Sequence, residues 1–199
     1  RYRASQLHAE VGGDFFDAFT VDDDCLIVIG DVQGHSLEAA VVMAELRYSL
    51  RAYAYDGHRP ADVLDRIDVL LERNDAELIA TACLGRVSSD RRALEIVSAG
   101  HLPLLLCRDG ETTFVETQGT LLGVGMPHEP QTIELRRGDR IVLVTDGLVE
   151  RRGELIEKGL ERLADAVRAG SDLHTEDLAQ DLATLGGASE DDVASWSSM

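Results

Sequence analysis

The order in which the spacing of apolar residues changes along the chain restricts its fold more than any other feature. Apolar residues first alternate over residues 15–21 and 25–30, and the acidic turn at residues 22–24 predicts a β-hairpin. The spacing then becomes helical from Ser36 to about Gly57. A second helical stretch begins at Pro60, so we expect two helices that pack as an antiparallel pair.

After Asn74-Asp75 apolar and polar residues alternate again, which predicts further strands. Two more predicted helices follow these strands. The predicted strands cover residues 78–87, 93–98, 102–107, 112–116, 131–135 and 140–145. The predicted helices cover residues 154–169 and 175–185, with Thr175 as the N-cap of the second. Strands joined by short turns predict an α+β domain in which helix pairs cover antiparallel sheets, rather than a parallel βαβ fold. The 199 residues fit a single domain, 1–199, which we expect to be a fragment of a longer multidomain regulator.

Composition limits the classes of partner. Against 37 acidic residues there are 19 lysines and arginines, which gives a formal net charge of −18. Such a surface repels nucleic acid and anionic lipid, and no apolar run approaches the ~20 residues that cross a bilayer, so we expect neither as a partner. Cys25, Cys83 and Cys107 are far apart in apolar stretches, which predicts three buried thiols and a cytoplasmic protein.

Aspartates stand at the ends of apolar stretches, where solubility does not explain them. Asp14 follows Gly12-Gly13, Asp31 follows the apolar residues 27–30, and Asp146 follows residues 141–145. A carboxylate at the end of a buried strand is costly unless a cation compensates it, and converging carboxylates repel one another. One such Asp is more often a turn residue, but three of them plus Asp191-Asp192 predict a site for Mg²⁺ or Mn²⁺.

These motifs, in their order and spacing, resemble the stage II sporulation protein E-like phosphatases, a branch of the protein phosphatase 2C (metal-dependent PPM) superfamily. The similarity extends over nearly the whole chain. The residues that carry it are 11–17, 30–36 with Ala39-Ala40, Thr81-Ala82, 98–103, 119–123, 138–150 and 191–193.

The resemblance implies a four-layer α-β-β-α sandwich and a serine/threonine phosphatase that needs two Mn²⁺ or Mg²⁺ ions. It implies that Asp31 and Asp146 are the catalytic carboxylates and that water activated between the two ions attacks the phosphate without a phosphoenzyme. The metal ligands implied are Asp14, Asp31 as the bridging ligand, the carbonyl of Val32, Asp146 and Asp191. Asp17 and Asp192 are expected around them, orienting water.

The partner that the resemblance implies is a phosphorylated protein, such as an anti-sigma-factor antagonist in bacterial partner-switching signalling. Dimerisation is left open. Chemistry alone allows His35 and His101 to be ligands or general acids, whereas the resemblance makes both structural. The tail after Val193, residues 194–199, is short and polar, so we expect the last strand to be frayed or absent.

Two alternative functions remain at this point. Residues 12–16 look like the Gly-Gly-Asp-Glu-Phe signature of diguanylate cyclases, although Phe15 stands where that signature has an acid. Release of phosphate from p-nitrophenyl phosphate, rather than a dinucleotide from GTP, distinguishes a phosphatase from such a cyclase. The other alternative is a non-catalytic binding module on a phosphatase scaffold, which would bind no Mn²⁺.

Overall fold

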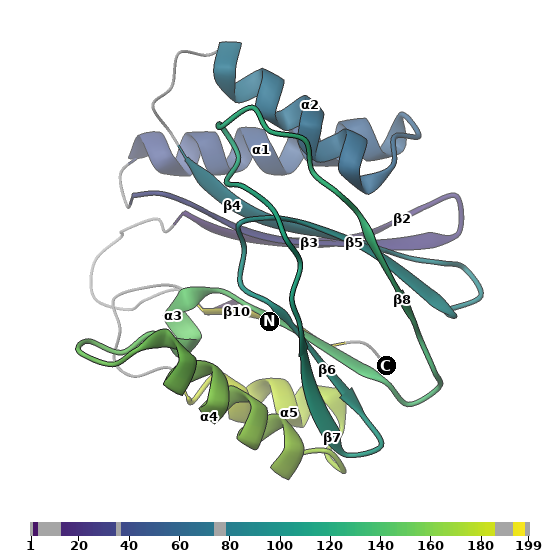
Figure 1. Cartoon of the computed structure of the whole chain (residues 1–199), viewed down its shortest axis with the longest axis vertical. Helices are drawn as coiled ribbons and strands as arrows, with labels where there is room; N and C mark the ends of the chain where they lie inside the picture. The colour runs from purple at the N-terminus through teal and green to yellow at the C-terminus, as the bar shows by residue number, and fades with distance from the viewer. Residues whose placement is uncertain (1, 4–12, 35–36, 74–78, 186–192, 198–199) are drawn as a thin grey trace. The chain divides into compact units, whose positions relative to one another are not determined.

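The computed structural model describes residues 2–3, 13–34, 37–73, 79–185 and 193–197, which form two compact units. The α1–α2 unit comprises Glu10–His101 and Thr117–Leu135, and the α4–α5 unit comprises Arg1–Ala9, Leu102–Glu116 and Arg136–Met199. Each unit contains one five-stranded antiparallel sheet together with helices (Figure 1). The predicted α+β class with two antiparallel sheets and flanking helices is therefore confirmed, while the single domain over residues 1–199 stays a prediction.

The sheet of the α1–α2 unit has the strand order β2-β3-β4-β5-β8. Its strands are β2 (Asp14–Val21), β3 (Asp24–Val32), β4 (Ala80–Val87), β5 (Ala93–Ala99) and β8 (Gln131–Glu134). The β2–β3 hairpin turns on Asp22 and Asp23, both with positive φ, at 49° and 71°. Two such residues match the right-handed twist of the paired strands. Asp24, predicted in the turn, instead pairs with Val21 in the ladder.

Helices α1 (Leu37–Tyr55) and α2 (Pro60–Arg73) lie side by side on one face of this sheet, as Figure 1 shows. Alternate strand residues point towards them, and together they form one apolar core. Its members include Phe15 and Phe19 of β2, Val28 and Val32 of β3, Leu46 and Leu50 of α1, and Val63 and Ile67 of α2. The predicted helix pair is confirmed within a few residues at each end.

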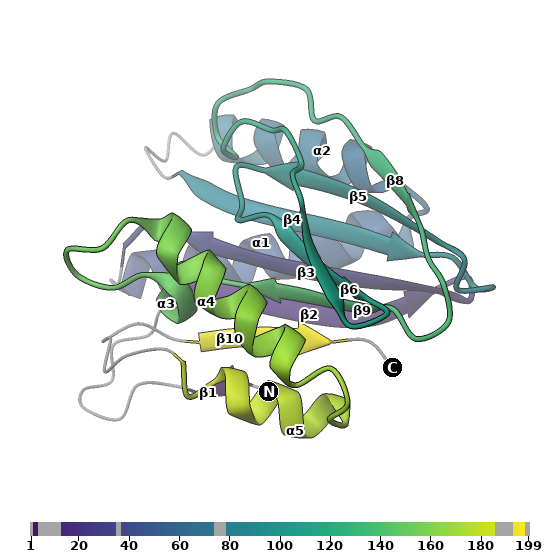
Figure 2. The same ribbon diagram turned by 60° about the horizontal axis from the view of Figure 1, so that its bottom comes forward.

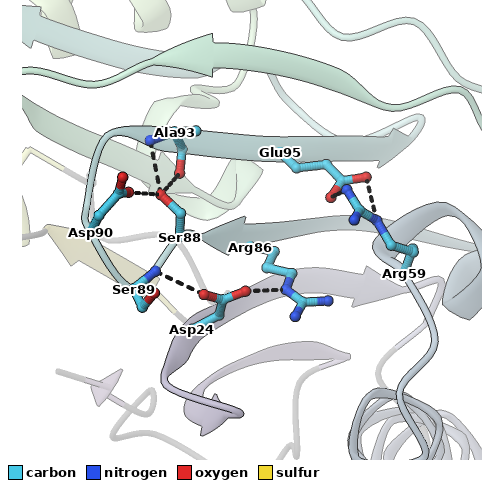
Figure 3. A network of polar contacts seen from close by, with 8 residues as sticks. All are labelled: Asp24, Arg59, Arg86, Ser88, Ser89, Asp90, Ala93 and Glu95. Carbon is cyan, nitrogen blue, oxygen red and sulfur yellow. Dashed lines mark hydrogen bonds and ion pairs between the residues drawn. The ribbon is translucent and has the colours of Figure 1, made fainter.

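Polar contacts fix the end of this sheet that carries the β4–β5 turn (Figure 3). Arg86 of β4 donates to Asp24 of β3 at 2.6 Å, and Asp24 also accepts from the main-chain N–H of Ser89 at 2.7 Å. Arg59, in the α1–α2 connection, forms an ion pair with Glu95 of β5 at 2.5 Å. These contacts help to hold the register of the ladder from β3 to β5, which places the residues at its opposite end.

The sheet of the α4–α5 unit has the strand order β1-β10-β9-β6-β7. Its strands are β1 (Tyr2–Arg3), β6 (Leu104–Arg108), β7 (Glu111–Val115), β9 (Arg140–Val144) and β10 (Val193–Ser197), and its helices are α3 (Asp146–Val149), α4 (Ile156–Ala169) and α5 (Thr175–Leu182). Figure 2 shows α4 and α5 beside the strands. Leu163 and Val167 of α4 share an apolar core with Val142 of β9.

Two expectations for this unit were wrong, and one short helix was missed. The last strand is present, because β10 pairs with both β9 and β1, and its ladder uses main-chain groups that polar residues offer equally well. The N-cap of α5 is His174 rather than Thr175, which is the first residue of the helix. The short helix α3 was not predicted, because four residues are too few to show a helical period.

Two of the three cysteines are buried as predicted. Cys83 and Cys107 are buried, and burial raises the pKa of the Cys83 thiol to about 12. Cys25 is only partly buried, contrary to prediction, because it lies beside the exposed hairpin turn at the start of β3. None of the helices in the described residues is long and apolar enough to span a membrane.

Candidate metal centre

Asp14 and Asp31 face each other across the first two strands of the α1–α2 unit. Asp14 is the first residue of β2 and pairs directly with Asp31, near the end of β3. Residues paired in this way project from the same face of a sheet. One carboxylate oxygen of each lies within 4.8 Å of the other, and Asp14 is buried while Asp31 is partly buried. The structure therefore brings together two of the carboxylates predicted from separate motifs.

The main chain beside this pair supplies a third oxygen. The N–H of Val32 donates to the carbonyl of Gly13 at 3.1 Å, which closes the end of the hairpin. A Cβ atom on Gly13 would lie 2.0 Å from the carbonyl oxygen of Val32 and 2.7 Å from Oδ1 of Asp31. These two oxygens therefore converge on the same small space, which only glycine at position 13 leaves open. The side chain of Val32 is 1% exposed and packs in the core, so its carbonyl is held firmly.

This donor set fits a hard divalent cation. Two carboxylates directly opposite each other in a ladder repel one another, and partial burial strengthens the repulsion. A cation between them removes this cost. Carboxylate and carbonyl oxygens without His or Cys suit Mg²⁺ or Mn²⁺ better than zinc. The predicted ligands Asp14, Asp31 and Val32 thus form a chemically consistent group.

A second row of polar groups continues across the sheet from Asp31. Asp31 pairs on its other side with Thr81 of β4, whose Oγ1 is 2.9 Å from Nδ1 of His101. The main-chain N–H of His101 donates to Oγ of Ser98 at 3.1 Å, and His101 is only 8% exposed. These contacts agree with the structural role expected for His101. Thr81 has no role among the predicted site residues, because its position beside Asp31 depends on strand register.

Asp17 lies on the opposite face of the sheet from Asp14, because the two are three residues apart on one strand. Its carboxylate contacts Arg47 and Arg51 of α1, each at 3.3 Å. Arg51 also lies over the ring of Phe19, 4.7 Å from its centroid. Asp17 thus ties β2 to α1, and its expected role in orienting water stays a prediction.

Asp146 is positioned within the α4–α5 unit by the junction of β9 and α3. Strand β9 ends at Val144, and Thr145, 1% exposed, precedes the first helical residue, Asp146. Helix α4 packs closely against the end of α3: a Cβ atom on Gly159 would lie 1.9 Å from the carbonyl oxygen of Val149. Asp146 therefore sits on a firmly held turn. Asp191, Asp192 and His35 lie outside the described residues.

One buried polar cluster was missed altogether. His128 is 4% exposed, and its Nδ1 lies 3.0 Å from Asp65 and 3.6 Å from Asp68, two residues of α2. No spacing in the sequence links residue 128 to residues 65 and 68, since the contact forms only when the loop before β8 folds onto α2.

Comparison with known proteins identifies the chain's relatives. The family model for stage II sporulation protein E (SpoIIE) matches residues 21–196. The phosphoserine phosphatase RsbU of Bacillus subtilis is 29% identical over 150 residues, which are 73% of this chain and 45% of RsbU. The phosphoserine phosphatase RsbP of the same organism is 26% identical over 159 residues, 75% of this chain and 38% of RsbP. The chain thus spans less than half the length of these relatives.

Solved structures agree with this relationship. The RsbU and RsbW domains of a Mycobacterium tuberculosis protein superpose with a TM-score of 0.86 at 32% identity, covering 96% of this chain and 56% of that one. The PP2C domain of SiaA from Pseudomonas aeruginosa gives a TM-score of 0.82 at 23% identity, covering 99% of this chain and 83% of that one. The second similarity shows a shared fold. Together with the family model, these matches do not support the diguanylate cyclase alternative.

Proposed function

The chain belongs to the stage II sporulation protein E family, and from this membership we propose that it is a metal-dependent protein phosphatase. Its substrate would carry phosphoserine or phosphothreonine, and an anti-sigma-factor antagonist in partner-switching signalling is the proposed class. RsbU and RsbP are named as phosphoserine phosphatases, which supports the reaction type. The facing carboxylates of Asp14 and Asp31 beside the carbonyl of Val32 are the observation that carries the proposal.

We assign the ligands in two groups. Asp14, Asp31 and the carbonyl of Val32 would hold one Mn²⁺ or Mg²⁺ ion, with Asp31 shared between two ions. Asp146 and Asp191 would bind the second ion. The position of Asp146 directly after a buried strand supports its assignment, and the resemblance alone supports that of Asp191.

The protein's own groups would act by position and charge. When bound, two divalent cations supply a Lewis acid for the phosphoryl oxygens and an activated water at neutral pH. Asp31 would place both cations through one carboxylate, so that its rigid position in β3 fixes the site. The Gly13 main chain leaves the space that these oxygens need. The hydrogen bond between Oγ1 of Thr81 and Nδ1 of His101 holds the neighbouring strand position next to Asp31.

The experiment that tests this proposal measures phosphate release from a phosphoserine peptide with Mn²⁺ and with EDTA. We expect turnover with Mn²⁺ and none with EDTA. Asp146→Asn should lower turnover more than about a hundredfold without unfolding the protein, since loss of groups that only support a metal ligand costs 10–100-fold. Asp172→Asn, at an exposed position in the same unit, is the matched control and should keep full activity.

Two outcomes would contradict the proposal. Turnover that is equal with EDTA and Mn²⁺ would remove the metal dependence. A folded wild-type protein that binds no Mn²⁺ and releases no phosphate would instead favour the non-catalytic binding module.

A further inference from the structure

Thr81 stands next to Asp31 in the sheet of the α1–α2 unit. The register pairs Asp31 of β3 with Thr81 of β4 on one side and with Asp14 of β2 on the other. Residues opposite each other in a ladder project from the same face, with Cβ atoms about 4.5–5.5 Å apart. The side chain of Thr81 therefore continues the row that the two candidate ligands begin.

The neighbours of Thr81 along β4 agree with this face. Ala80 and Ala82 are both buried in the core that α1 and α2 share with the sheet. Since successive residues of a strand point to opposite faces, Thr81 points away from these helices. Both the N–H and the carbonyl of Ala80 bond to Leu122, at 3.4 and 2.9 Å. The next residue, Thr81, therefore turns its own main-chain groups towards Asp31, which keeps the two strands at a fixed separation.

His101 fixes the direction of the Thr81 hydroxyl. Nδ1 of the ring lies 2.9 Å from Oγ1 of Thr81. His101 is only 8% exposed, and its main-chain N–H donates to Oγ of the fully buried Ser98 at 3.1 Å. A bridge between Ala82 and Gly100 also holds the chain before His101 against β4. The hydroxyl thus has one defined partner, on the β5 side of β4.

The Thr81 hydroxyl can accept from one partner and donate to another, because it has one hydrogen and two lone pairs. When Nδ1–H of His101 donates to Oγ1 of Thr81, the hydroxyl hydrogen stays available for a second partner. The carboxylate of Asp31, and water on a cation that it binds, offer oxygen acceptors at the neighbouring strand position. Groups that hydrogen-bond the ligands of a metal orient them, and their loss costs about 10–100-fold in metal affinity or activity.

We propose that Thr81 is a positioning residue of the metal centre. Its hydroxyl accepts from Nδ1–H of His101 and donates to an oxygen in the coordination shell of the ion that Asp31 holds. This inference rests on the proposed function, because it needs Asp31 to bind a divalent cation. His101 acts only through Thr81. Since neither residue contacts the substrate, their loss should weaken metal binding and leave the KM for a phosphopeptide at saturating Mn²⁺ unchanged.

The test is Mn²⁺ titration by calorimetry of Thr81→Val, which removes the hydroxyl and keeps the branched shape. We expect the Kd for Mn²⁺ to rise at least about tenfold, while Thr81→Ser, which keeps the hydroxyl, should stay within about threefold of wild type. Thr20→Val, at an exposed position near the other end of β2, is the matched control and should bind Mn²⁺ as wild type does.

A double-mutant cycle tests whether His101 acts through Thr81. His101→Phe removes both ring nitrogens and should raise the Kd for Mn²⁺ about as much as Thr81→Val does. The double variant should bind Mn²⁺ no more weakly than either single variant, because the effects of residues that share one network are not additive. Additive losses would overturn the coupling. If His101→Phe does not fold, the comparison of Thr81→Val with Thr81→Ser decides the proposal by itself.

The two possible failures are distinguishable. A Thr81→Val protein with wild-type Mn²⁺ affinity, or a Thr81→Ser protein that binds as weakly as Thr81→Val, would overturn the role of the hydroxyl while leaving the phosphatase proposal in place. Absence of Mn²⁺ binding and of Mn²⁺-dependent turnover of p-nitrophenyl phosphate by wild-type protein would overturn the proposed function itself. Thermal unfolding of each variant with EDTA separates a loss of metal affinity from a loss of the metal-free fold.

Discussion

At the scale of single residues, Gly13 is the most sensitive position of the candidate centre. A methyl group there would overlap the carbonyl oxygen of Val32 and press on the carboxylate of Asp31. We expect Gly13→Ala to lower the free energy of unfolding by about 1–3 kcal/mol, as overpacking does, and to weaken Mn²⁺ binding at least tenfold. Isothermal titration and urea unfolding measure both effects.

The control for this substitution is Gly57→Ala. Gly57 has a φ of +88° and nothing within 4 Å of the position of an added Cβ. Alanine there should cost about 1–2 kcal/mol of left-handed backbone strain and leave Mn²⁺ affinity unchanged. If Gly13→Ala also leaves the affinity unchanged, the space beside Val32 is not a metal site.

The sequence identified Asp14 and Asp31 as separate candidates because each follows an abrupt change from apolar residues or glycine to a carboxylate. Their pairing as direct neighbours could not be predicted, since a shift of one residue in the β2–β3 register would place them on opposite faces. Thr81 was not assigned a role for the same reason. The residue types alone indicated candidate metal ligands. The β2–β3 register that makes Asp14 and Asp31 direct neighbours is known only from the folded hairpin.

At the scale of secondary-structure elements, Asp139 ties β6 to the turn before β9. Burial raises the pKa of its carboxyl, but hydrogen bonds from the Arg108 guanidinium, at 2.9 and 2.6 Å, and from the N–H of Arg136 outweigh burial and lower that pKa overall. A lowered pKa in the folded state means that the stabilisation is present above the unfolded pKa, about 3.9, and is lost as pH falls through the folded value.

We therefore expect Asp139→Asn to be less stable than wild type by about 2 kcal/mol at pH 7, the scale of charge-assisted hydrogen bonds. The difference should shrink as the pH falls below about 4, because wild-type protein then loses the same interaction. Urea unfolding of both proteins at pH 7 and pH 3 measures this. An equal difference at the two pH values would show that the charge of Asp139 contributes nothing.

Element boundaries show which local signals are reliable. Pro60 and the regular apolar spacing of residues 60–73 predicted α2 to its first residue. The strand β10 was predicted poorly, because its polar composition hides a ladder that depends on β9 and β1 as neighbours. The spacing of apolar residues therefore predicts helices and strands that bury an apolar face. It misses strands such as β10, which are held mainly by main-chain hydrogen bonds to their neighbours.

At the scale of the whole molecule, the net charge of −18 makes bound cations stabilising. Metal that binds the folded chain and not the unfolded one adds about 2.7 kcal/mol at a concentration one hundred times the Kd. For a chain of this length that corresponds to a rise of about 5–10 °C in Tm. Calorimetry with Mn²⁺ and with EDTA checks this, and an unchanged Tm at saturating Mn²⁺ would contradict it.

The central claim is that Asp31 joins Asp14 in holding divalent cations, and Mn²⁺ titration of Asp31→Asn by calorimetry tests it most directly. We predict that wild-type protein binds two ions, and that Asp31→Asn remains folded but loses binding of both. The metal-free variant should also be more stable than metal-free wild type, by up to about 1 kcal/mol, because the repulsion from Asp14 is relieved. Mn²⁺ binding by Asp31→Asn with wild-type stoichiometry and affinity would contradict the claim.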